Sequence, residues 1–225
     1  MVNLRCIRFA AICLPLLFGC TTRERQQLPI SKARLLVVSD VDDTVKDTHV
    51  TLSRSTHLKN PLLIADFAKR WSAVRGMPCL YREWKRREGA EFAYVSNGPR
   101  AYERRVKGFL IANDFPTGPI LLNPRFPMSG PAHKEDAVAK LLVAYPRARV
   151  VLIGDSGERD PKIFATLLRR FPNRIAAVFI RAVTTDAGAT VATLEDFRSA
   201  GKWTVFREPE DIASADALHP RARSN

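Results

Sequence analysis

Short apolar runs recur along the chain and alternate with longer amphipathic stretches. The runs are continuous, which is typical of strands buried on both faces of a sheet. The stretches between them suit helices, so the alternation predicts an α/β fold with a largely parallel sheet and right-handed crossovers. The expected strands lie at 35–38, 92–95, 120–122, 150–153 and 176–180, and the expected helices at 100–112, 134–145 and 161–171.

Prolines support these helix limits. Pro161 stands in the first turn of its expected helix, where a missing N–H costs no hydrogen bond. Pro146 and Pro172 follow the ends of two helices, which a proline cannot continue. In open sheets of this kind, ligands bind beyond the carboxyl ends of the strands. Polar residues that follow the apolar runs are therefore the candidates for a functional site.

The first twenty residues have the pattern of a targeting segment. Arg5 and Arg8 form a positive region before an apolar run from Phe9 to Phe18, which is too short to span a bilayer as a helix. The run ends in Leu-Phe-Gly-Cys20, which resembles a bacterial lipobox, where cleavage before the cysteine frees it for lipidation. We therefore expect a lipoprotein signal peptide over 1–20. An ordinary signal peptide or an uncleaved anchor is the alternative.

The rest of the chain divides into three parts. We expect residues 21–33 to be a polar tether, 34–208 a single folded domain and 209–225 a tail. Three of the four cysteines lie in the leader, so only Cys79 would remain in the mature chain. A single thiol forms no intrachain disulfide and no cysteine-rich zinc site. Its apolar neighbours predict that Cys79 is a buried, structural residue.

The formal net charge of +13 arises from 36 Lys+Arg against 23 Asp+Glu. Such a balance favours anionic partners, namely phosphate esters, acidic lipid surfaces or nucleic acid. The basic residues are scattered, however, and no nucleic-acid-binding motif accompanies them. We therefore expect no nucleic-acid partner. A solvated basic surface is an equally good account of the charge.

Three aspartates follow the first apolar run, in the sequence Ser39-Asp40-Val41-Asp42-Asp43-Thr44, and the first two are Asp40 and Asp42. Carboxylates two residues apart, just past a buried strand, can both project into one crevice. Asp40 could attack phosphorus to give an aspartyl-phosphate that water then hydrolyses. Asp42 could protonate the leaving oxygen and later deprotonate the water. Crowded carboxylates repel each other, so we expect a hard divalent cation with oxygen ligands, for which Mg²⁺ fits best.

Two groups could hold the phosphate. Ser96 and Asn97 follow the second run, where a hydroxyl and backbone N–H groups can bind phosphate oxygens. Lys134 opens the helix before the fourth run. Its ammonium group would offset the charges of the phosphate and the aspartates during transfer.

Two further aspartates surround the turn after the fourth run. Asp155 follows Gly154 at the expected strand end and is a candidate metal ligand. Asp160 stands near the start of the next helix. It could either cap that helix or support the metal site, and the sequence favours neither role.

These motifs, in this order, resemble the four motifs of the haloacid dehalogenase (HAD) superfamily. More narrowly, residues 35 to 183 are similar to the catalytic domain of the App1-type phosphatidate phosphatases. The matching stretches are Ser39–Lys46, Gly76–Tyr81, Tyr94–Asn97, Gly118–Leu122, His133–Lys134, Leu152–Gly157 and Asp160-Pro161.

The resemblance implies an HAD-like, Rossmann-type three-layer sandwich with a flap and a minimal cap. The implied reaction is dephosphorylation of phosphatidate to diacylglycerol, with Asp40 as nucleophile and Asp42 as acid and base. Thr44 and Ser96 would hold phosphate, and Lys134 would steady the phosphoaspartate. The implied Mg²⁺ ligands are the Asp40 carboxylate, the Asp42 backbone carbonyl and Asp155, with Asp160 in support.

About fifty residues separate the first two motifs. Residues 45–60 could form the flap and 60–75 a short cap whose apolar side chains admit a lipid tail. The alternative is a helix packed on the core through positions 63, 67 and 71, and the helical spacing favours this reading.

The leading hypothesis is therefore a magnesium-dependent phosphatase of the bacterial cell envelope, anchored through a lipidated Cys20 on the periplasmic face, that acts on a phosphorylated lipid. The same chemistry on a small soluble phosphate ester is the first alternative. A non-catalytic lipoprotein that binds anions or a partner is the second. The intact set of Asp40, Asp42, Lys134 and Asp155 favours an enzyme.

Overall fold

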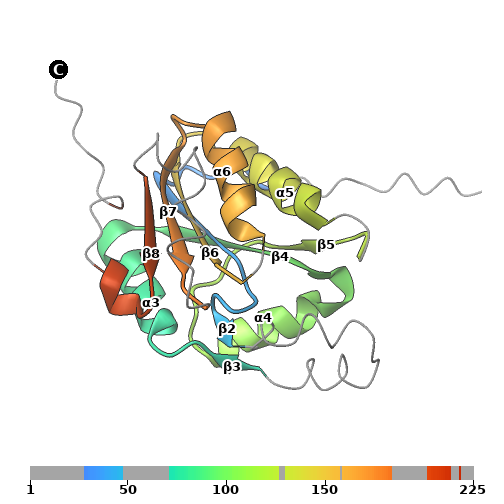
Figure 1. Ribbon diagram of the computed structural model, residues 1–225, viewed down its shortest axis with the longest axis vertical. Coiled ribbons are helices and arrows are strands. Elements are labelled where there is room, and N and C mark those ends of the chain that lie inside the picture. The colour runs from blue at the N-terminus through green and yellow to red at the C-terminus, as the bar shows by residue number, and fades with distance from the viewer. Residues whose placement is uncertain are drawn as a thin grey trace, which may run out of the picture.

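The computed structural model describes residues 28–47, 71–126, 130–157, 159–183, 202–213 and 218. They form an α/β sandwich around a six-stranded sheet of order β5-β4-β1-β6-β7-β8 (Figure 1). Every neighbouring pair in this sheet is parallel. The strands are β1 (Leu35–Ser39), β4 (Glu91–Pro99), β5 (Ile120–Asn123), β6 (Arg149–Asp155), β7 (Ile175–Arg181) and β8 (Trp203–Phe206).

Helices cover both faces of the sheet, which gives three layers (Figure 1). Within β1, Leu36 and Val38 pack into the core under α5 and α6, whereas Leu35 and Val37 pack into the core under α3 and α4. A strand buried on both sides needs apolar residues at every position, which explains the continuous runs. The helices are α3 (Met77–Glu88), α4 (Glu103–Ala112), α5 (Gly130–Ala144) and α6 (Asp160–Arg170), with short 3₁₀ helices η1 (Arg100–Tyr102) and η2 (Pro209–Ile212).

The predicted α/β class and parallel sheet are confirmed, and each expected strand and helix has its counterpart. The larger elements that were not anticipated are α3 and β8. Helix α3 follows Gly76, whose φ of +82° is a left-handed conformation that glycine adopts without strain. Strand β8 is a four-residue edge strand with only its last residue, Phe206, fully buried, so it lacks the long apolar run that marked the other strands.

Helix α3 also corrects the prediction for Cys79, which is exposed. The buried face of the helix consists of Met77, Leu80, Tyr81 and Trp84. Position 79 lies between the members of this helical stripe and faces solvent, where Arg82 donates a hydrogen bond to its sulfur. Apolar neighbours in sequence are therefore no guide to burial when the segment is a helix.

The base of the predicted flap is a small second sheet. Strand β2 (Lys46–Asp47) pairs antiparallel with β3 (Ser72–Ala73). Trp71 packs on the core, edge-on to Phe109 at a ring distance of 5.8 Å. Trp71 lies just before β3 and is not helical, so the proposed helical stripe does not reach it. Positions 48–70, which include the remainder of the predicted flap and cap, lie outside the described residues.

The folded part extends beyond both expected boundaries. Within the tether, the backbone N–H of Ser31 donates to the carbonyl of Ala144 at 2.8 Å. Beyond residue 208, the side chains of Pro209, Ile212 and Leu218 are buried. The predicted leader, including Cys20, and the end of the tail lie outside the described residues. Of the helices that the structure describes, none has the length and apolar character needed to cross a membrane.

Candidate active site

The site lies at the carboxyl edge of three adjacent strands. Strand β1 is flanked by β4 on one side and β6 on the other. Asp40 follows β1 directly, and its N–H donates to the carbonyl of Ile153 in β6 at 2.8 Å. Ser96 lies in β4, and Asp155 is the last residue of β6. The sheet order therefore brings together residues that are more than a hundred positions apart, as the sequence predicted.

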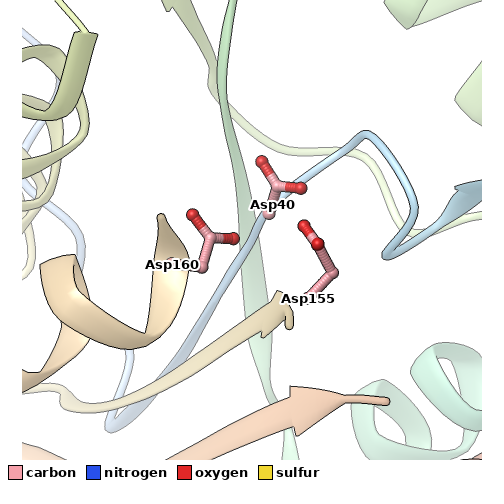
Figure 2. A group of neighbouring side chains, drawn as sticks. All are labelled: Asp40, Asp155 and Asp160. Carbon is pink, nitrogen blue, oxygen red and sulfur yellow. The ribbon is translucent and has the colours of Figure 1, made fainter. Parts of the chain in front are cut away.

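Three buried carboxylates form the centre of the site. Asp40, Asp155 and Asp160 each offer an oxygen atom, and these atoms lie within 4.8 Å of one another. Figure 2 shows that the three side chains converge from the end of β1, the end of β6 and the start of α6. All three are at most 4% exposed. Buried carboxylates favour a cation among them, so this triad could bind a metal ion.

Gly154 makes this convergence possible. A Cβ atom at position 154 would lie 2.8 Å from both Cβ and Cγ of Asp160. Real Cβ atoms essentially never approach other atoms so closely, so the strand end must be glycine for the Asp160 carboxylate to lie over it.

The structure speaks against one of the two roles weighed for Asp160, that of helix cap. The N-cap of α6 is Arg159, and it makes no side-chain cap hydrogen bond. Asp160 is the first residue of the helix, and its Oδ1 pairs with the Lys134 ammonium group. Its Oδ2 is buried and accepts no hydrogen bond from the described residues. Asp160 therefore belongs to the charged cluster and does not cap the helix.

Lys134 supplies the positive charge that these carboxylates require. Its Nζ lies 2.6 Å from Asp40 Oδ1 and also contacts Asp160 Oδ1. The lysine is 2% exposed. An ammonium group buried to this degree is stable only when it is paired, and here it bridges the end of β1 and the start of α6. The expectation that Lys134 faces the aspartates is met.

The turn after Asp40 directs further groups towards the site. Thr44 is fully buried and its hydroxyl donates to Asp40 Oδ2 at 3.3 Å. Asp43 has a φ of +54°, a left-handed conformation that aspartate tolerates better than most residues. Its carbonyl accepts a hydrogen bond of 2.8 Å from Arg181 at the end of β7. Strand β7, which is separated from β1 by β6, thus helps to fix the turn that carries the motif.

Asp42 occupies a different environment from Asp40. Its Oδ2 accepts a hydrogen bond of 3.1 Å from the Ser96 hydroxyl, and its Oδ1 lies 2.5 Å from the Lys46 ammonium group. The Asp42 side chain is 20% exposed and is not a member of the acidic triad. The metal-binding role expected of Asp42 concerned its backbone carbonyl, and it stays a prediction.

The proposed phosphate-binding residues lie beside Asp42. Besides donating to Asp42, the Ser96 hydroxyl accepts a hydrogen bond of 2.9 Å from the N–H of Gly98. Asn97 is half-buried, and its Oδ1 accepts no hydrogen bond from the residues in the described ranges. Their roles, like that of Thr44, remain predictions.

Sequence reasoning assigned no role to a hydrogen-bond chain that supports Asp40 from behind. The Ser39 hydroxyl donates to the Asp40 carbonyl at 2.7 Å and lies 2.8 Å from the Tyr81 hydroxyl. Burial raises the pKa of Tyr81 well above its ordinary value, so the phenol stays protonated and can donate to Ser39. Only the three-dimensional packing of α3 on β1 reveals this contact, because 42 positions separate the two residues.

The fold and the site together define an α/β protein with a buried, lysine-bridged acidic cluster at the carboxyl edge of a parallel sheet. The chain belongs to the family described as the catalytic domain of phosphatidate phosphatase APP1, whose model matches residues 35–182. All of the site residues discussed above fall within this range.

The chain is also similar to individual proteins. Phosphatidate phosphatase APP1 of Saccharomyces cerevisiae is 34% identical over 152 residues, which are 64% of this chain and 25% of that protein. An uncharacterised protein of Schizosaccharomyces pombe is 28% identical over 159 residues, 67% of this chain and 25% of that protein. The chain thus matches about a quarter of the length of each relative. Among solved structures, a chain of the Pnkp1/Rnl/Hen1 complex gives a TM-score of 0.44 at 13% identity, covering 72% of this chain and 55% of that one.

The lysine bridge yields a stability prediction. Lys134→Met should lower the free energy of unfolding by about 3–5 kcal/mol, because it leaves Asp40 and Asp160 buried without their shared counter-ion. Urea unfolding followed by circular dichroism measures this difference. Lys140→Met, at an exposed position of the same helix, is the matched control and should change stability by less than about 0.5 kcal/mol. Equal effects of the two substitutions would contradict the assigned bridge.

Proposed function

We propose that this protein is a phosphatase that releases inorganic phosphate from phosphatidate through an aspartyl-phosphate on Asp40, with the chemistry of the HAD superfamily. The observation that carries the proposal is the burial of Asp40 and the contacts made by its two carboxylate oxygens. Asp40 is a buried carboxylate at the end of a central strand, with Oδ1 held by Lys134 and Oδ2 by Thr44, in a chain of the APP1 catalytic-domain family. Both contacts fix the orientation of a nucleophile before the substrate arrives.

In the first step, an Asp40 oxygen forms a bond to phosphorus while the bond from phosphorus to the glycerol oxygen breaks. Asp42 gives its proton to that oxygen, and diacylglycerol leaves. In the second step, Asp42 takes a proton from water, whose oxygen attacks phosphorus. The bond to Asp40 breaks, inorganic phosphate leaves and the Asp40 carboxylate is restored.

Two hydroxyl groups are available to hold the phosphoryl oxygens. The Thr44 hydroxyl donates a hydrogen bond to Asp40, and the Ser96 hydroxyl donates one to Asp42. Both hydroxyls can rotate to donate to an incoming phosphate. Lys134 contacts the nucleophile directly and would balance the charge on the phosphoaspartate.

The residues of the site fit a divalent cation. Three buried carboxylates converge, and Asp160 Oδ2 accepts no hydrogen bond from the described residues. We propose that Asp40, Asp155 and Asp160 hold Mg²⁺, together with the backbone carbonyl of Asp42. The ion would supply charge neutralisation for the phosphate and for the carboxylates.

We propose further that the protein acts at the bacterial cell envelope, held by a lipid on Cys20. The leader pattern supports the anchor, and the formal charge of +13 favours an anionic lipid surface. A membrane location would keep the site beside a lipid substrate. Because a single acyl chain anchors weakly, the basic charge and the lipid would act together.

The substrate class is tested by phosphate release from the full-length protein with Mg²⁺. Phosphatidate in mixed micelles is compared with a nucleotide, a sugar phosphate and an aryl phosphate, and Asp40→Asn is the blank. We expect a preference of at least about tenfold in kcat/KM for phosphatidate and no steady-state turnover by the variant. Turnover only on soluble esters would overturn the lipid assignment while keeping the chemistry. Turnover by Asp40→Asn would overturn the nucleophile.

Metal dependence is tested by removal and return of the ion. EDTA should abolish phosphate release, and excess Mg²⁺ should restore it. Calorimetric titration of Mg²⁺ gives a readout that does not depend on turnover, and Asp155→Asn should bind the ion at least about tenfold more weakly. Asp136→Asn, at an exposed position of α5, is the control and should bind normally. Full activity in chelator would disprove the metal site.

The anchor is tested by Cys20→Ser in a bacterial host. The wild-type protein should carry a lipid on its processed N-terminus, detectable by mass spectrometry, and should sediment with the envelope membranes. The variant should be neither lipidated nor processed at this position. An unmodified Cys20 in the wild-type protein would refute the proposal.

A further inference from the structure

Lys46 is a buried, charged residue to which the proposed reaction gives no role. It is 4% exposed and stands in β2, at the base of the small sheet beside the site. Its ammonium group lies 2.5 Å from Asp42 Oδ1. Burying an ammonium group and a carboxylate together costs solvation that their attraction only partly returns. Stability alone is therefore a poor explanation for a lysine in this position.

The local backbone fixes the distance between the two residues. The N–H of Lys46 donates to the carbonyl of Val41 at 2.9 Å, and the N–H of Asp43 donates to the carbonyl of Lys46 at 2.7 Å. These bonds close the turn over Val41–Lys46 on itself. This closed turn brings the Lys46 side chain close to the carboxylate of Asp42, four residues earlier in the chain.

Trp71, the residue just before β3, contacts the lysine. The Lys46 Nζ lies 4.2 Å from the centre of the Trp71 ring. The tryptophan precedes β3, which pairs with β2 through Lys46 and Ala73, and it packs on Phe109 of α4. A cation over an indole face is attracted to it, so the ring and the Asp42 carboxylate both help to hold the ammonium group.

The opposite side of Asp42 is held by Ser96. Its hydroxyl donates to Asp42 Oδ2 at 3.1 Å and is itself oriented by the N–H of Gly98. One oxygen of the carboxylate is therefore held from β4 and the other from β2. These two contacts, one a hydrogen bond and one an ion pair, restrict the rotation of the carboxylate.

We propose that Lys46 is a positioning residue that, with Ser96, orients the Asp42 carboxyl group for proton exchange with the leaving oxygen and with water. This inference rests on the proposed phosphatase function. Lys46 acts through Asp42 and does not itself hold the phosphate. Replacing Lys46 should therefore lower the rate most for substrates whose leaving group most needs a proton.

The test compares leaving groups in the full-length protein. An aryl phosphate releases a stable phenolate and gains little from a general acid, whereas an alkyl phosphate releases a basic alkoxide and depends on one. Proton transfer by a placed side chain contributes roughly 10²–10⁴-fold to a rate. We expect Lys46→Met to lower kcat/KM at least about tenfold for the alkyl ester and less than about threefold for the aryl ester. Lys85→Met, at an exposed position of α3, is the matched control and should change neither rate.

A double variant separates positioning from an independent role. Asp42→Asn alone should show the same preference for aryl esters in stronger form. Because Lys46 acts through Asp42, adding Lys46→Met to Asp42→Asn should produce no further loss beyond about twofold on the alkyl ester. Equal losses by Lys46→Met on both esters, or multiplied losses in the double variant, would overturn the proposal and indicate that Lys46 binds the phosphate itself.

The outcome also distinguishes this inference from the function on which it rests. If the wild-type protein hydrolyses none of the esters, the proposed function fails and the positioning role fails with it. If the wild-type protein is active and Asp42→Asn shows the leaving-group effect while Lys46→Met does not, only the role of Lys46 is disproved. Circular dichroism of each variant verifies that the fold is retained.

Discussion

The ammonium group of Lys134, shared by Asp40 and Asp160, is the interaction on which the site depends. Carboxylates at the buried edge of a sheet repel each other strongly, because the protein interior screens charge poorly. A lysine that contacts two of them offsets part of this repulsion. Three elements must meet for this bridge to form, namely the end of β1, the helix α5 and the first turn of α6.

The order of the strands explains why these elements meet. Strand β1 lies between β4 and β6, and the crossover helices α5 and α6 lie on the same face of the sheet. The two helix N-terminal regions are thereby placed beside the end of β1. At that edge, Gly154 lets the Asp160 carboxylate lie against the strand end. The absence of a side chain at position 154 is therefore needed for Asp160 to approach the other carboxylates.

The sheet and two members of the acidic triad, Asp40 and Asp155, could be predicted from the sequence, because both follow from one regularity. Continuous apolar runs mark buried strands, and polar residues after such runs gather at one edge of a parallel sheet. Asp40 and Asp155 lie at this edge as expected, whereas Lys134 was assigned from its place near the start of a helix. The helix that contains Cys79 was not predicted. Without the helical spacing of its buried residues, nothing in the sequence indicated that this thiol is exposed.

The contacts that hold the predicted residues could not be obtained in the same way. The pairing of Ser39 with Tyr81 depends on how α3 lies against β1, and that arrangement is set by packing of the aromatic core. The contact of Lys46 with Trp71 depends on a two-residue strand pair, which is too short to leave a pattern of its own. Sequence patterns identify residues that face one edge, whereas the second layer of contacts arises from tertiary packing.

The surroundings of Asp40 and Asp42 differ in a way that suits the two different tasks proposed for them. Asp40 is almost fully buried in the triad, held by a lysine that also serves Asp160. Asp42 is one-fifth exposed and is held from the small sheet and from β4. A nucleophile must remain ionised and aimed, whereas an acid and base must exchange protons with groups that arrive from solvent. Two carboxylates with such separate environments can therefore divide these roles although they are two residues apart.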